Sequence, residues 1–87
     1  MQKLWTDKGW DDYLYWQTQD KKTIKRINLL IKDIERNGAL NGIGRPESLK
    51  HDLSGWVSRE IDDFNRIVYR IKEGNLEITQ CKGHYND

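Results

Sequence analysis

The chain has 87 residues and a formal net charge of +1, with 33% charged and 36% hydrophobic residues. This length predicts one domain over residues 1–87 and leaves no room for a second core. No apolar run approaches the roughly 20 residues of a membrane-spanning helix, and the first residues do not resemble a signal peptide. The single cysteine, Cys81, excludes an internal disulfide and a zinc site built only from cysteines. We therefore expect a small cytoplasmic domain with no membrane association.

The first twenty residues predict a short strand and a helix. Residues 2–5 can form the strand, and Thr6 and Asp7 offer N-cap chemistry to the helix that follows. One face of that helix is expected to carry Trp10, Tyr13, Leu14 and Gln17, which follow the i, i+3, i+4, i+7 spacing. A break is expected over residues 17–20, where Asp20 is a candidate N-cap for a second helix.

An apolar stripe predicts a longer second helix. Its members recur every three or four residues: Ile24, Ile27, Leu30, Ile31 and Ile34. Gly38 is a typical residue to end such a helix. Residues 21–36 also carry six basic and two acidic side chains, and most of the basic ones lie off the stripe. Such a block attracts phosphate polymers or an acidic partner, although a solvated lysine-rich helix face has the same composition.

The second half of the chain changes to a period of two. Residues 37–48 hold three glycines and the only proline, and they predict a loop. Strands are expected at residues 56–61, 66–72 and 76–82, joined by turns at 62–65 and 73–74. This order predicts an α+β fold with two N-terminal helices packed on one face of a small antiparallel sheet. The arginines are expected on the other face of the sheet.

The loop and strands of this half carry side chains suited to RNA cleavage, which can converge if the strands are neighbours. They are Glu47, Lys50, His51, Arg59, Arg66, His84 and Tyr85. The reaction needs a base for the 2′-OH proton, cations for the charged phosphorane and an acid for the leaving 5′ oxygen. It needs no metal, because the 2′-OH is an internal nucleophile. Taken singly, these residues also have plain structural interpretations: a solvated turn residue (Glu47), an edge cation (Arg66), a frayed tail (His84) and a cap on the core (Tyr85).

Metal and nucleotide sites are poorly supported. His51 and His84 lack metal-ligand spacing, and Cys81 and His84 would project to opposite faces of a strand. The stretch from Gly42 to Gly44 lacks the rest of a phosphate-binding loop. We therefore expect neither a metal nor a cofactor.

Several separated motifs together resemble a known family. They are the stretches 10–16 (WDDYLYW), 25–28 (KRIN), 30–33 (LIKD), 42–51 (GIGRPESLKH), 52–55 (DLSG), 58–59 (SR), 66–69 (RIVY) and 84–85 (HY). In this order and register they resemble the YoeB/Txe-type toxins of the RelE superfamily, which are ribonucleases of bacterial toxin–antitoxin systems.

The resemblance implies an mRNA interferase, a metal-independent endoribonuclease that cuts mRNA in the ribosomal A site. By matching position, Glu47 would be the general base, Arg66 would stabilise the transition state, His84 would be the general acid and Tyr85 would order or stack the substrate. Lys50 and Arg59 would hold phosphate groups. Ribosomal RNA would be gripped by the basic helix through Lys21, Lys22, Lys25, Arg26 and Lys32.

The resemblance also implies partners. A YefM/Axe-like antitoxin would fold a disordered segment onto the toxin and block its site. DNA would be bound only indirectly, through that antitoxin, and a homodimer is compatible with the family.

Two departures from the family bear on activity. Arg59-Glu60 stands where relatives usually carry two arginines. The alternation of Val57, Arg59 and Ile61 groups Arg59 with apolar residues and turns Glu60 to the other face, where an anion would repel RNA and lower the rate. The chain also continues past His84-Tyr85 with Asn86 and Asp87, and the added negative charge is expected to raise the pKa of His84.

Two rival functions remain. A catalytically weakened homologue could serve mainly as an antitoxin-bound repressor, and Glu60 favours this alternative. A gyrase-poisoning relative on the same fold is disfavoured, because gyrase inhibition has no need of the loop glutamate or of the terminal His84-Tyr85 pair.

Overall fold

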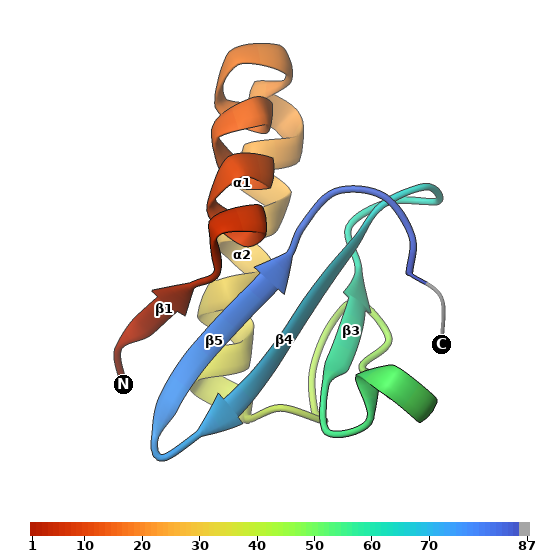
Figure 1. Ribbon diagram of the computed structural model, residues 1–87. Helices are drawn as coiled ribbons and strands as arrows, with labels where there is room; N and C mark the ends of the chain where they lie inside the picture. The colour runs from red at the N-terminus through yellow and green to blue at the C-terminus, as the bar shows by residue number, and fades with distance from the viewer. Residues whose placement is uncertain (86–87) are drawn as a thin grey trace.

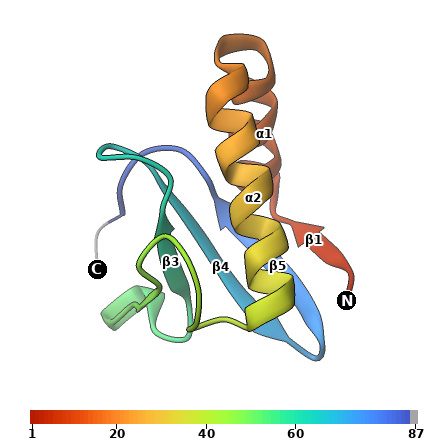
Figure 2. The ribbon, with the colours of Figure 1, turned by 180° about the vertical axis from the view of Figure 1, so that it is seen from behind.

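Two helices lie on one face of a five-stranded sheet in the computed structural model of the chain, which describes residues 1–85 (Figures 1 and 2). The elements in chain order are β1 (Lys3–Trp5), α1 (Asp7–Gln19), α2 (Lys21–Asn37), β2 (Glu47–Ser48), the 3-10 turn η1 (His51–Leu53), β3 (Val57–Glu60), β4 (Arg66–Lys72) and β5 (Asn75–Gln80). The predicted α+β architecture is therefore confirmed. Neither helix of the described residues has the length and apolar character needed to cross a membrane.

The strands lie side by side in the order β1-β5-β4-β3-β2. Neighbouring strands from β2 to β5 are antiparallel, whereas β1 runs parallel to β5. The expectation of a wholly antiparallel sheet is thus wrong at one edge. The parallel pair arises because the chain crosses from β1 through both helices before it enters the β3–β4–β5 hairpins.

Both helices begin at the predicted caps. The Thr6 hydroxyl accepts a hydrogen bond from the Gly9 amide, and the Asp20 carboxylate accepts from the amides of Lys22 and Thr23. Asp20 alone separates the helices, so the break is shorter than the expected residues 17–20. As predicted, α2 ends at Gly38, which has a φ of 90°.

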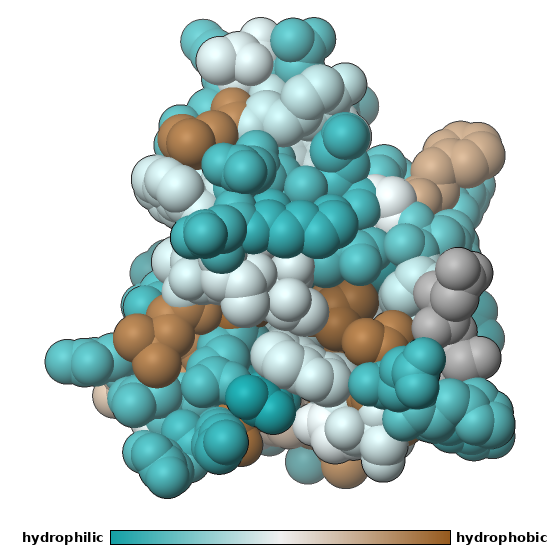
Figure 3. Space-filling view, in the orientation of Figure 1, coloured by the Kyte–Doolittle hydropathy of each residue, from teal (hydrophilic) through white to brown (hydrophobic). Residues whose placement is uncertain are grey.

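The core lies between α2 and the sheet. Ile27, Leu30 and Ile34 of α2 are fully buried against apolar strand residues, among them Tyr69, Leu76 and Ile78. The stripe read from the sequence is therefore the core face of α2, except for the half-buried Ile24. Hydrophilic residues dominate the surface seen in Figure 3, where the apolar residues form only separate patches.

The inner face of α1 differs from the expected one. Trp10 and Leu14 are 44% and 39% exposed, whereas Gly9 and Asp12 are buried. The reason is a close backbone approach, because a Cβ added at Gly9 would lie 2.5 Å from the carbonyl oxygen of Ile78. This contact turns the Gly9 and Asp12 side of α1, together with Trp16, toward the end of β5.

Smaller differences concern the strand ends. The expected loop over residues 37–48 closes with the edge strand β2, which pairs with β3 through two residues. Strands β3 and β5 are shorter than predicted, and β5 stops at Gln80. The chain that follows β5 contacts α1, because the Trp16 indole donates to the carbonyl oxygen of Cys81 at 2.8 Å.

Candidate active site

The register of the sheet aligns polar side chains on the face turned away from the helices. Glu47 of β2 pairs with Ser58 of β3, and Ser58 pairs with Val68 of β4. Two residues farther along β3, and therefore on the same face as Ser58, Glu60 pairs with Arg66. Paired residues of antiparallel strands point to the same face, so Glu47 and Arg66 share a face although 19 positions of the sequence separate them.

A pocket of about 360 Å³ opens on this face. Four of its lining residues are the predicted catalytic ones, namely Glu47, Arg66, His84 and Tyr85. The rest of the lining consists of Arg45, Pro46, Ser58 and Glu60. The structure therefore brings together a carboxylate from β2, a guanidinium from β4, and an imidazole and a phenol from the C-terminal segment.

Arg66 is held by one end of its guanidinium. Its Nη1 donates to the carbonyl oxygens of Asp62 (2.6 Å) and Asn65 (3.0 Å), while Nη2 points toward Glu60. The turn that supplies these carbonyls is itself fixed, because the Asp62 carboxylate accepts from the amides of Phe64 and Asn65. A side chain that is only 14% exposed and anchored in this way loses little freedom when it meets an anion.

The C-terminal segment is tied to the sheet by its backbone. The Arg66 amide donates to the Gly83 carbonyl at 3.0 Å, and the Gly83 amide donates to Asn65 Oδ1 at 2.8 Å. Gln80 Nε2 also donates to the carbonyls of Gly83 and His84. The exposed His84 ring therefore projects from a fixed main chain and not from a frayed tail.

Tyr85 reaches the floor of the pocket. Its phenol oxygen lies 2.9 Å from Ser58 Oγ, and Ser58 is only 2% exposed. The Tyr85 ring also lies 5.9 Å from the His84 ring, measured between centroids, at a tilt of 40°. The two terminal aromatic residues are thus oriented by each other and by β3. Asn86 and Asp87, on which the expected rise of the His84 pKa depends, lie outside the described residues.

Glu60 lines the pocket and brings a negative charge to it. Its Oε2 is 3.8 Å from Arg66 Nη2 and 3.8 Å from Arg45 Nη1. The strand alternation predicted this orientation, and the structure confirms it. Any anion that pairs with Arg66 would have to share that guanidinium with the Glu60 carboxylate.

Arg59, one of the two residues expected to hold phosphate groups, does not line the pocket. It is fully buried on the helix side of β3, next to Asp33 of α2 and Tyr69 of β4. The expectation that it faces the substrate is wrong, because neighbours on a strand alternate and Glu60 takes the pocket side. Lys50 precedes η1 and is exposed, outside the residues that line the pocket.

The basic residues of α2 fall into two groups. Lys21, Lys22, Lys25 and Lys32 are exposed along the helix. Arg26 is half-buried, and its Nη2 donates to the carbonyl oxygen of Glu60 at 3.1 Å. Arg26 therefore supports the end of β3 behind the pocket, while the lysines are available to solvent.

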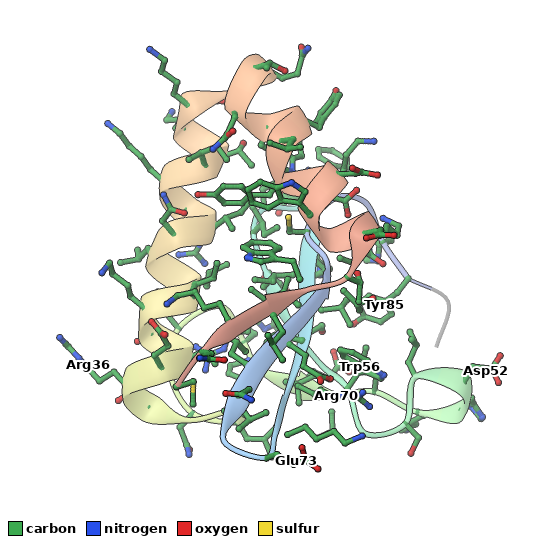
Figure 4. The ribbon with its side chains drawn as sticks, turned by 60° about the vertical axis from the view of Figure 1, so that its left-hand side comes forward. Arg36, Asp52, Trp56, Arg70, Glu73 and Tyr85 are labelled. Atoms are coloured by element: carbon green, nitrogen blue, oxygen red, sulfur yellow. The ribbon has the colours of Figure 1, made fainter. Side chains whose placement is uncertain are left out.

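The sequence interpretation did not single out the residues that support the pocket. Ser58 orients Tyr85, and Gln80 fastens the C-terminal segment. The same alternation that exposed Glu60 also puts Ser58 on this face, so the signal for Ser58 was present. Farther along the face, the Arg70 guanidinium stacks over the Trp56 ring at 4.3 Å and pairs with Glu77, and Figure 4 shows Trp56 and Arg70 side by side.

Residues 1–85 offer no cluster of three histidine, cysteine or acidic side chains that could hold a metal ion. Cys81 is buried at the end of β5, and burial raises the pKa of its thiol to about 12. A thiol in this state is a poor nucleophile, because the thiolate is the reactive form. Cys81 also lies outside the residues that line the pocket.

Comparison with known proteins identifies the class and then the family. Toxin YoeB of Escherichia coli (strain K12) is 48% identical over 85 residues, which cover 98% of this chain and 100% of the relative. A solved YoeB/ParE toxin from Agrobacterium tumefaciens superposes with a TM-score of 0.94 at 41% identity, covering 98% of this chain and 100% of its own. The YoeB of Staphylococcus aureus, solved as a heterotetrameric complex with YefM and as a dimer, superposes with a TM-score of 0.91 at 45% identity, covering 98% of both chains.

The architecture is thus the RelE-like fold of bacterial toxins. The model of a YoeB-like toxin of bacterial type II toxin-antitoxin systems matches residues 5–85. The chain belongs to this family of YoeB-like toxins.

Proposed function

We propose that this toxin is a ribosome-dependent, metal-independent endoribonuclease that cleaves mRNA in the A site by attack of the 2′-OH on the adjacent phosphate. The observation that carries the proposal is the gathering of Glu47, Arg66, His84 and Tyr85 around one pocket. A carboxylate can take the 2′-OH proton and an imidazolium can protonate the leaving 5′ oxygen. A guanidinium can stabilise the phosphorane between these two steps.

The supporting contacts suit these roles. Arg66 keeps Nη2 toward the pocket while Nη1 is anchored, so it can meet the non-bridging oxygens of a phosphate with little reorganisation. The exposed His84 ring can reach a leaving oxygen that enters from solvent. Tyr85, held by Ser58, can stack or order a base beside the scissile bond. The nucleophile belongs to the substrate, so the scheme requires no metal-bound water.

The proposal extends to the partners. The exposed lysines of α2, Lys21, Lys22, Lys25 and Lys32, would bind ribosomal RNA phosphates without reading sequence, and Lys50 would hold a phosphate of the message. A YefM-like antitoxin is the expected protein partner, by analogy with the Staphylococcus aureus complex. Homodimer formation is proposed on the same ground.

The weakened-toxin alternative rests on Glu60. An anion 3.8 Å from Arg66 opposes the approach of a phosphate, so the chain could act mainly as an antitoxin-bound repressor with little cleavage. Expression in bacteria without an antitoxin separates the two functions, because an active ribonuclease arrests growth and a repressor does not.

The decisive experiment maps RNA ends on messages translated in a reconstituted system. Wild-type protein is expected to produce new ends at codons in the A site, and Glu47→Gln is expected to produce about 10²-fold fewer. Cleavage by Glu47→Gln at the wild-type rate would contradict the mechanism. A wild-type protein that yields no new ends would favour the repressor function.

A further inference from the structure

Arg59 uses its whole guanidinium inside the protein. Nε donates to the Tyr69 phenol at 2.9 Å, and Nη1 donates to Asp33 and to the carbonyl of Ile43 at 2.9 Å. Nη2 donates to the carbonyls of Gly38 (2.9 Å) and Asn41 (2.7 Å). An arginine has five N–H donors, so these five bonds leave none for a substrate.

Arg59 and Tyr69 together bind four main-chain carbonyls of one loop. Besides the three carbonyls that Arg59 holds, the Tyr69 hydroxyl donates to the carbonyl of Ala39 at 2.5 Å. The loop therefore has four of its main-chain oxygens fastened by two buried side chains between residues 38 and 43. It continues through Gly44, whose carbonyl accepts from the Glu60 amide at 2.7 Å, to Arg45 and Glu47 of the pocket.

Asp33 completes the anchor from α2. Its Oδ2 accepts from Arg59 and from the amide of Ile43 at 3.0 Å, and its Oδ1 accepts from Asn37. The bond from Arg59 is the main reason that the pKa of Asp33 lies below its ordinary value, so the carboxylate is ionised at neutral pH. Asp33 thus neutralises the buried guanidinium and also binds the loop directly.

We propose that Arg59 and Asp33 are positioning residues that fix the loop over residues 38–44 and thereby hold Glu47 in place as the base. The proposal rests on the function proposed above. A general base has to lie within about 2.6–3.2 Å of the proton it takes, and a misplacement of about 1 Å can cost roughly 10²-fold in rate. Glu47 sits on a strand of two residues at the sheet edge, so its place depends strongly on the loop that precedes it.

The test compares Asp33→Ala with the conservative Asp33→Asn, which keeps an oxygen acceptor for Arg59 and Ile43. Asp33→Ala is expected to lower the single-turnover cleavage rate at saturating ribosomes about tenfold or more, and Asp33→Asn is expected to lower it less. Each change is also made in the Glu47→Gln background. Because the pair acts through Glu47, Asp33→Ala should have little further effect there. An equal loss in both backgrounds would mean a general structural role and would overturn the proposal.

A second variant disturbs the pair without removing a charge. A Cβ at Gly42 would lie 1.9 Å from Asp33 Oδ2 and 2.9 Å from Arg59 Nη1, whereas a Cβ at Gly74 would meet nothing within 4 Å. Both glycines have positive φ, so alanine strains the backbone at either position. Gly42→Ala is expected to reduce cleavage at least tenfold, and Gly74→Ala is expected to leave it within about twofold. Equal effects of the two would contradict the proposal.

Amide hydrogen exchange gives a readout that does not depend on activity. Asp33→Ala should accelerate exchange at Ile43 and Glu60, whose amides bond Asp33 and Gly44, and leave Leu76 of β5 unchanged. Unchanged exchange at Ile43 and Glu60 would overturn the anchoring. If the wild-type protein cleaves no RNA, both the proposed function and the role of Arg59 and Asp33 in catalysis are wrong. The exchange data would still show whether Arg59 and Asp33 hold the loop over residues 38–44.

Discussion

Glu60 and Arg66 face each other across β3 and β4, with Glu60 Oε2 3.8 Å from Arg66 Nη2. The side chain of Glu60 is 39% exposed, and its Oε2 also lies 3.8 Å from Arg45 Nη1. The carboxylate therefore occupies the electrostatic position that an incoming phosphate would take. In the proposed reaction, an anion at this position would raise the energy of a phosphorane, and solvent would screen only part of that effect.

Replacing Glu60 should accelerate cleavage. Glu60→Gln removes the negative charge at nearly constant shape, and we expect about a tenfold higher rate in a reconstituted translation assay. Glu60→Arg should raise the rate at least as much, since it adds a cation beside the phosphate. The matched control is Glu73→Gln in the β4–β5 turn, far from the pocket (Figure 4), which should leave the rate unchanged. A rate that stays the same or falls in both Glu60 variants would refute the attenuation.

The three groups proposed for proton transfer and charge stabilisation should each be indispensable. We expect Glu47→Gln, Arg66→Ala and His84→Gln to lower the cleavage rate by about 10²-fold or more. Lys72→Ala, at the exposed far end of β4, is a control for the loss of a surface cation and should have little effect. Circular dichroism checks that each variant is folded. Wild-type rates in all three variants would end the assignment of this pocket.

Local patterns predicted most of the architecture. The 3–4 periodicity of the α2 isoleucines, the caps at Thr6 and Asp20 and the alternation in β4 depend only on neighbouring residues, and each is confirmed. The pairing of β1 with β5 joins residues that lie more than 70 positions apart, so no local pattern could specify it. The burial of Gly9 likewise depends on its contact with Ile78 of a distant strand.

The site was predictable to a similar degree. The family motifs pointed to Glu47, Arg66, His84 and Tyr85, and the strand alternation predicted that Glu60 lies on the same face. All five residues line the pocket. The same alternation contradicted a substrate contact for Arg59, but the family resemblance outweighed it. The alternation placed Ser58 on the pocket face, but its contact with Tyr85 appears only when the C-terminal segment folds back on β3 and β4. Gln80 has no distinctive spacing in the sequence, and its bonds to the carbonyls of Gly83 and His84 likewise depend on that fold.

Cys81 should be inert in the folded protein. It is fully buried, its amide donates to Asp12 at 3.0 Å, and the raised pKa of about 12 keeps the thiol protonated at pH 8. We expect no alkylation by iodoacetamide at pH 8 after an hour, and complete alkylation once guanidinium chloride unfolds the chain. Mass spectrometry measures both. Rapid labelling of the native protein would show that the end of β5 opens readily.

Acid should weaken the fold partly through Asp33. The bond from Arg59 lowers the pKa of Asp33 in the folded state, so the unfolded chain binds the proton more readily. The resulting stabilisation is present above the ordinary aspartate pKa of about 3.9 and is lost as the pH falls through the folded value. Asp33→Asn should therefore lose less stability than wild type between pH 5 and pH 2.5, measured by urea midpoints. Asp63→Asn, in an exposed turn, is the control and should follow wild type.

The bond between Ser58 and Tyr85 should matter for rate and not only for stability. Tyr85→Phe and Ser58→Ala each remove one partner of the 2.9 Å contact, and we expect each to reduce cleavage about three- to tenfold by loosening the ring beside His84. The double variant should be no worse than the worse single one, because both changes break the same bond. The measurement is a double-mutant cycle: the single-turnover cleavage rates of wild type, the two single variants and the double variant. Additive losses would indicate that the Tyr85 hydroxyl acts on the substrate directly and not through Ser58.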